Sequence, residues 1–200
     1  MPDEELPAVR RTAQRVAYEN AWLTLTEDDV TFADGTTGIY GVVHKRDYAV
    51  VVAVDGDRVH LVEQFRYPVG MRRWELPQGA VPEANTTPEG IASTELAEET
   101  GLRAGHLRVI GFLHDAYGYS SQGFHVVVAT DLTQGEPHRE VEEQDMRSAW
   151  FGLSEVWAMV DDGQITDSAT VAALALFERH SGRLGQSGMS TSTRPNGPAS

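Results

Sequence analysis

Short apolar runs separated by turn residues dominate the middle of the chain. The runs DYAVVVAV and RVHLVEQFRY flank Asp55-Gly56, a dipeptide that favours a tight turn between antiparallel strands. The first run is apolar at nearly every position, so we expect a central strand that is buried on both faces. Similar runs predict strands at 106–113, 123–132 and 148–153.

Helical periodicity marks three further segments, at 88–100, 154–161 and 167–179. The first has clear limits, because Thr87 can cap its start, Pro88 suits its first turn, and Gly101 with Leu102 forms a left-handed stop. Strand-like runs from about residue 16, broken by Asp34-Gly35, predict an amino-terminal hairpin or meander. This order of strands and helices is typical of an α/β fold.

The two ends of the chain differ from its middle. Residues 1–15 are polar and charged, and residues 181–200 are rich in Ser, Gly, Thr and Pro without apolar periodicity. Such segments bury too little apolar surface to offset the entropy of ordering. We therefore expect a flexible segment at 1–15, one domain at 16–180 and a disordered tail at 181–200.

Charge and composition narrow the classes of function. The chain has 16 basic against 30 acidic residues, a formal net charge of −14, and no cysteine. A negative surface repels nucleic acids and anionic membranes, and without thiolates a metal must be held by oxygen or imidazole. No run has the length of a membrane helix, and the start lacks the order of a secretory signal, so we expect a soluble, cytoplasmic protein.

Three glutamates crowd the end of the predicted central helix, in the stretch TELAEETGL. Glu95, Glu98 and Glu99 fall within an arc of about 100° on that helix, while Leu96 points elsewhere. On spacing alone, a solvated acidic face is the commoner arrangement. The alternative is a site for Mg²⁺ or Mn²⁺, because such cations favour carboxylate oxygens and relieve the repulsion.

The stretch WELPQGAVPEANTTPEGIASTELAEETGL, residues 74–102, resembles the Nudix box of the Nudix hydrolases. The resemblance extends over about residues 16–178, and over that length the chain is similar to the ADP-ribose pyrophosphatase branch of the family. The resemblance implies a Nudix-type α/β/α sandwich with a mixed sheet and an amino-terminal strand extension. It also implies a homodimer in which the amino-terminal strands of each subunit pack against the partner subunit.

The resemblance further implies roles for individual residues. The metal ligands would be Glu95, Glu98, Glu99 and the backbone carbonyl of Gln78, and the catalytic groups would be Glu98, Glu99, Glu142 and Glu143. Arg66, Trp22 and Gly79 would contact or make room for the substrate. Four of these residues also have a purely structural explanation. Glu142 and Glu143 would lie in a solvated acidic loop, Arg66 would form a surface ion pair, and Trp22 would be a core aromatic.

The box departs from the family pattern at several points. Gly79 and Glu95 stand sixteen positions apart rather than fifteen, and Thr94 occupies the position of an arginine that would pair with the glutamates. Gly118 stands where many ADP-ribose-type members carry a proline. These departures bear on the substrate and on the support of the glutamates more than on the fold.

These features predict Mg²⁺-dependent hydrolysis of the pyrophosphate bond in a nucleoside diphosphate linked to another group, with ADP-ribose or a nucleotide sugar as the leading substrate. Mn²⁺ is the alternative metal. A dinucleotide polyphosphate hydrolase is an alternative activity. A nucleotide sensor that has lost turnover through Thr94 and the altered loop is an alternative from another class.

Overall fold

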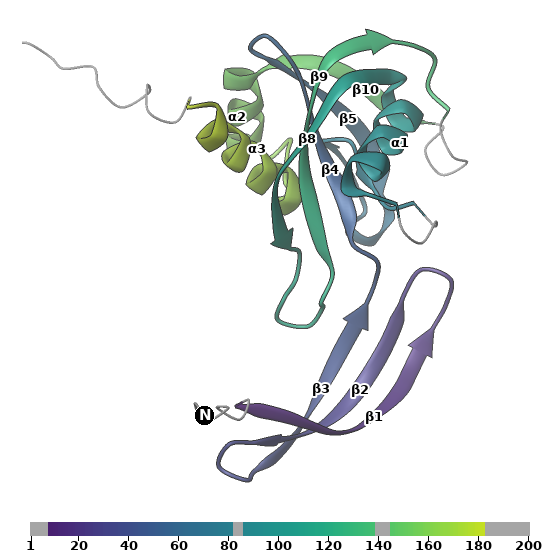
Figure 1. Ribbon diagram of the computed structural model, residues 1–200, viewed down its shortest axis with the longest axis vertical. Coiled ribbons are helices and arrows are strands. Elements are labelled where there is room, and N and C mark those ends of the chain that lie inside the picture. The colour runs from purple at the N-terminus through teal and green to yellow at the C-terminus, as the bar shows by residue number, and fades with distance from the viewer. Residues whose placement is uncertain (1–7, 82–85, 139–144, 183–200) are drawn as a thin grey trace, which may run out of the picture.

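The computed structural model describes residues 8–81, 86–138 and 145–182, which form a three-stranded amino-terminal sheet and a seven-stranded central sheet. The amino-terminal sheet projects away from the part of the molecule that carries the helices (Figure 1). The elements are β1 (Val9–Glu19), β2 (Thr24–Phe32), β3 (Thr37–His44), β4 (Tyr48–Asp55), β5 (Arg58–Arg66), η1 (Tyr67–Val69), β6 (Met71–Glu75), β7 (Gln78–Gly79), α1 (Pro88–Thr100), β8 (Leu102–His114), β9 (Gly123–Gln134), β10 (Arg147–Gly152), α2 (Leu153–Asp161) and α3 (Ser168–Ser181).

The central sheet is mixed, in the order β10-β5-β4-β9-β8. Strands β4 and β9 are parallel, whereas the other pairs are antiparallel. Two short strands complete it: β6 pairs with β5, and β7 pairs with β4. The predicted α/β fold with a mixed sheet is confirmed, and β7 brings the glycine of the box directly against the central strand.

Strand β4 is buried on both faces, as its apolar run predicts. Val50 and Val52 pack into the cluster that includes α2 and α3, while Ala49, Val51 and Ala53 pack into the cluster that includes α1. The helices therefore cover opposite faces of the sheet. Alanine side chains allow α1 to approach β4 closely, and burial of a side chain such as Leu96 of α1 contributes ~1.5–3 kcal/mol.

The limits of α1 confirm the prediction from sequence. The side-chain oxygen of Thr87 accepts a hydrogen bond from Gly90 N at 3.1 Å, and Pro88 begins the helix. Gly101 ends it with φ 76°, a left-handed conformation that glycine adopts without strain. These two ends fix which helical turn carries the glutamates.

Other boundaries differ from the sequence predictions. Strand β1 begins at Val9, so residues 9–15, expected to be flexible, pair with β2. Helix α3 extends to Ser181, and residues 183–200 lie outside the described part of the chain. Strands β6 and β7 were not predicted, because they are too short to show an apolar period of their own. Among the described residues, no helix combines the length and apolar character that crossing a bilayer demands.

A buried histidine on β5 makes the stability of the fold depend on pH. His60 is 4% exposed and packs edge-on against Trp150, with ring centroids 4.8 Å apart. Burial lowers the pKa of His60 to about 4 from an ordinary value of 6.5. The unfolded chain therefore binds more protons than the folded chain between these two values, so the free energy of unfolding rises with pH across that window.

We expect acidification from pH 6.5 to 4 to destabilise the protein through His60 by about 3 kcal/mol, at about 1.4 kcal/mol per pH unit. The variant His60→Gln should lose this part of the pH dependence. Urea unfolding at a series of pH values measures it, with His106→Gln on the exposed side of β8 as the control. An unchanged slope in His60→Gln would contradict the assignment.

Candidate active site

The acidic edge of α1 is turned into the protein. Glu95 is 8% exposed and Glu99 is 1% exposed, while Glu98 is only partly buried. A solvated acidic face is therefore excluded for Glu95 and Glu99. Buried carboxylates need compensating charge or hydrogen-bond donors, which makes the surroundings of these two side chains the place to look for chemistry.

Strand β7 lies directly against these glutamates. A Cβ atom placed on Gly79 would stand 2.3 Å from Glu95 Oε2, so this close approach requires glycine. The backbone N–H of Gln78 donates to Glu99 Oε2 at 3.3 Å. Pairing of Gln78 with Val50 of β4 holds this contact in place. Residues 78–79 and the end of α1 thus form one unit.

An ion pair between the half-exposed Arg66 and the buried Glu75 lies next to this unit. Arg66 donates to both carboxylate oxygens of Glu75, at 2.6 and 3.1 Å, and Gln64 Nε2 donates to Glu75 Oε1 at 2.6 Å. Glu75 is 3% exposed, and burial raises its pKa against the opposing charge of Arg66. Arg66 also interacts electrostatically with Glu99.

Arg66 was expected to form either a surface ion pair or a contact with substrate phosphate, and these contacts bear on the first of the two. Its ion-pair partner is a buried carboxylate rather than one on the surface, and its side chain stays 41% exposed. That exposure leaves room for a second, anionic partner. Arg66 also supplies positive charge near Glu99, where Thr94 provides none.

Asp167 joins the site from the start of α3, a contact that the sequence analysis missed. Asp167 Oδ2 accepts hydrogen bonds from Thr170 N at 2.8 Å and Thr170 Oγ1 at 2.7 Å, and from Gln78 Nε2 at 3.2 Å. Leu76 N in turn donates to Thr170 Oγ1 at 2.9 Å. The segment between β6 and β7 is therefore held by α3 on one side and by α1 on the other. The capping pattern Asp-x-x-Thr was the available signal, but it points only to a helix start.

Three other predicted residues are not placed among these groups. Trp22 lies in the turn between β1 and β2 and is 76% exposed, so it is not a core aromatic. Asn20 Oδ1 shapes that turn by accepting hydrogen bonds from Trp22 N and Leu23 N, both at 2.9 Å. Glu142 and Glu143 lie outside the described residues.

The donor chemistry of the site suits a hard divalent cation. Glu95 and Glu99 place carboxylate oxygens on successive turns of α1, and the side-chain Oε1 of Gln78 is buried without a hydrogen-bond partner. Within the described ranges, no group of three Asp, Glu, His or Cys side chains is arranged to hold a metal. Mg²⁺ needs only one or two carboxylates when substrate phosphates and water complete its shell, so the residues fit such an ion.

Comparisons with known proteins find related chains. A family model described as "NUDIX domain" matches residues 43–174, and one described as "Nucleoside diphosphate sugar hydrolase N-terminal domain" matches residues 10–43. An ADP-ribose pyrophosphatase of Mycobacterium tuberculosis (strain ATCC 25618 / H37Rv) is 33% identical over 159 residues, which cover 78% of this chain and 77% of that protein.

A further relative and a solved structure agree with these matches. An ADP-ribose pyrophosphatase of Bacillus subtilis (strain 168) is 27% identical over 168 residues, covering 83% of this chain and 90% of that protein. A crystal structure described as an ADP compounds hydrolase superposes with a TM-score of 0.78 at 21% identity. The superposition covers 90% of this chain and 99% of that one, and it supports the fold.

The contact between Gly79 and Glu95 yields a direct prediction. In Gly79→Ala the new methyl group must displace the Glu95 carboxylate, because the ideal Cβ position is 2.3 Å from Glu95 Oε2. We expect the catalytic rate to fall by roughly 10- to 100-fold while the unfolding temperature changes little, because the displaced atoms are the end of a flexible side chain. Gly152→Ala, with nothing within 4 Å and a φ of −66°, is the matched control. Equal rates in the two variants would refute a role for this contact.

Proposed function

The chain belongs to the Nudix family of hydrolases, and on that premise we propose that it cleaves the pyrophosphate bond of ADP-ribose or a related nucleotide sugar with the help of Mg²⁺. The observation that carries this proposal is the burial of Glu95 and Glu99 against Gln78 and Gly79. Two relatives named ADP-ribose pyrophosphatase, and the match of residues 10–43 to a nucleoside diphosphate sugar hydrolase domain, support the choice of substrate.

Each residue of the site has a part in this reaction. Glu95, Glu99, Glu98 and the Gln78 carbonyl would hold the metal, which when bound neutralises the diphosphate and activates water. Arg66, already fixed by Glu75, would present its exposed N–H groups to a phosphate oxygen, a geometry suited to guanidinium. Asp167 would keep Gln78 in position through its side-chain amide.

The bond changes are those of an anhydride hydrolysis. Water attacks one phosphorus of the diphosphate, the bridging P–O bond breaks, and ADP-ribose yields AMP and ribose 5-phosphate. A base must accept the proton of the water and must lie within hydrogen-bond reach of it. For this role we propose Glu142, with Glu143 beside it, on the basis of the resemblance to the ADP-ribose pyrophosphatase branch.

We also propose that the protein works as a homodimer formed through its amino-terminal sheet. That sheet projects from the helix-bearing part of the molecule (Figure 1) and exposes large apolar side chains: Val16 is 58%, Tyr18 56% and Ile39 66% exposed. Large apolar side chains exposed along one sheet are the kind of surface that a second copy would cover. In a dimer, the exposed Trp22 of one copy would be free to stack on the adenine bound by the other.

The activity can be tested with a substrate panel. We expect ADP-ribose with Mg²⁺ to give AMP and ribose 5-phosphate on chromatography, and expect Glu99→Gln to lose at least the roughly 10- to 100-fold that even partners of metal ligands contribute. Glu89→Gln, in the first turn of the same helix, is the control. Faster turnover of a dinucleotide polyphosphate would replace the substrate, and binding of ADP-ribose without any turnover would replace the enzyme by a sensor.

The dimer is tested separately by sedimentation. We expect wild-type protein to sediment as a dimer, and expect Val16→Asp and Ile39→Asp to sediment as monomers, because each would bury an unpaired charge in the contact. Val69→Asp, which changes an exposed apolar residue outside the amino-terminal sheet, should remain a dimer. A monomeric wild-type protein at assay concentrations would overturn the proposed assembly.

A further inference from the structure

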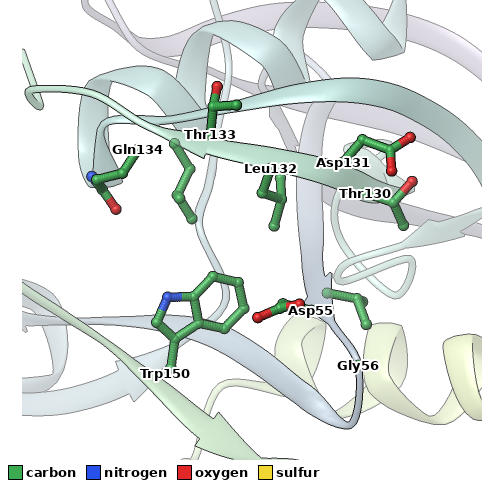
Figure 2. Close-up of a pocket in the computed structure, with 10 residues that line it drawn as sticks. Asp55, Gly56, Thr130, Asp131, Leu132, Thr133, Gln134 and Trp150 are labelled. Carbon is green, nitrogen blue, oxygen red and sulfur yellow. The ribbon is translucent and has the colours of Figure 1, made fainter.

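A cavity of about 740 Å³ lies at the end of the central sheet remote from β7. It opens between the carboxyl ends of β4 and β9 and the middle of β10, and its lining includes Asp55, Leu102, Asp131, Leu132 and Trp150. Figure 2 shows Trp150 on one side of the gap and Leu132 on the other. A volume of this size falls in the range of small-molecule sites.

The cavity exists because α1 covers only part of its face of the sheet. Along β4, Ala49, Val51 and Ala53 pack under the helix, and the next residue of the same alternation is Asp55. The helix has ended by then, at Thr100, and Leu102 already belongs to β8. The layer that α1 fills therefore continues as open space, where Leu102, Leu132 and Trp150 lie among polar side chains.

A local distortion of β9 contributes a side chain to this space. Asp131 has φ 56°, a left-handed conformation for a residue other than glycine, and Gly105 on β8 leaves only 3.0 Å for an added Cβ beside it. The distortion lets Leu132 pack with the α1-side cluster, and in Figure 2 Leu132 points toward Trp150. Left-handed conformations of this kind are often retained where a site needs them.

The aromatic wall of the cavity is held in place before any ligand arrives. The indole of Trp150 meets the ring of His60 at a centroid distance of 4.8 Å and an interplanar angle of 70°. The guanidinium of Arg58 lies 5.4 Å from the centre of the Trp150 ring and pairs with Asp55 at 2.5 Å. A side chain supported in this way loses little further freedom on binding.

The charges around the cavity select among ligands. Its lining contains two aspartates, in a chain of net charge −14. Asp55 is already paired with Arg58, whereas Asp131 faces no basic side chain among the residues that line the cavity. Phosphorylated ligands are therefore disfavoured. The contact with Arg58 shows that the ring of Trp150 accepts a planar cation, and since Arg58 already neutralises Asp55, the charge of a cationic ligand is matched by Asp131.

From these observations we propose that the cavity is a second ligand site, one that binds a planar, cationic nitrogen heterocycle without phosphate. The ring of the ligand packs between Trp150 and Leu132, and its positive charge faces Asp131. Gln134, which Figure 2 shows at the opposite end of the gap from Asp55, borders the ligand there.

This site is separate from the proposed catalytic centre. Gly79 pairs with Ala49 near the start of β4, whereas Asp55 ends that strand, so six residues at about 3.3 Å each place the two roughly 20 Å apart. None of the residues assigned to metal or substrate above lines the cavity. Binding in the cavity therefore need not involve the diphosphate.

Isothermal titration of the full chain with 1-methylnicotinamide, a permanently cationic pyridinium, tests the proposal. We expect saturable binding at millimolar concentrations or below, and weaker binding of nicotinamide, its neutral analogue. Trp150→Leu should weaken binding by about tenfold or more, because stacking on an aromatic ring is lost, whereas Trp150→Phe should keep most of it. Leu132→Trp, which fills the gap, should abolish binding.

Matched variants separate charge, fold and location. Asp131→Asn should weaken binding of the cation but not of nicotinamide, since asparagine also tolerates the left-handed backbone. Asp162→Asn, just after the end of α2, should change neither the affinity for 1-methylnicotinamide nor that for nicotinamide. Glu99→Gln should leave binding intact, so that failure of the proposed hydrolase activity and failure of this site are told apart. The proposal would be overturned if wild-type protein did not bind 1-methylnicotinamide. It would also be overturned if Trp150→Leu and Leu132→Trp were folded and bound 1-methylnicotinamide as tightly as wild-type protein does.

Discussion

The withdrawal of carboxylates from water is the constraint on which the site depends. Glu75, Glu95 and Glu99 are each less than a tenth exposed, and an uncompensated carboxylate in such surroundings would take up a proton. Compensation comes from Arg66, from Gln64, and from the backbone N–H of Gln78. Hydrogen bonds of this kind hold the carboxylate oxygens in fixed directions and favour their ionised form over the protonated one.

Strand β4 turns this local requirement into a property of the whole fold. It pairs with β5, β9 and β7, and its two faces pack against different helices. Because β7 is only two residues long, its position is set almost entirely by β4, by the glutamates of α1 and by Asp167 of α3. Loss of packing on either face of β4 would therefore shift β7 and disturb the site, even when none of the site residues is changed.

The sequence predicted those parts of the molecule that rest on local signals. The bounds of α1 follow from Thr87 and Gly101, and the burial of β4 follows from its continuous apolar run. Contacts between distant segments had no such signal. Gln78 and Asp167 are 89 positions apart, and the pairing of Arg66 with Glu75 requires β5 and β6 to be neighbours, which no periodicity announces. The distortion at Asp131 is likewise a tertiary effect, because aspartate in a strand-like run carries no mark of a left-handed backbone.

The replacement of an expected arginine by Thr94 shows how the charge balance of the site is maintained. An arginine on α1 would move with the helix that carries the glutamates. Arg66 instead ends β5, a strand within the central sheet, and reaches the same electrostatic environment as Glu99 while bonded to Glu75. The positive charge is thereby tied to the sheet, where pairing with β6 fixes the backbone at Arg66. What the site requires is a cation of fixed position beside buried carboxylates, and that requirement does not prescribe which element supplies it.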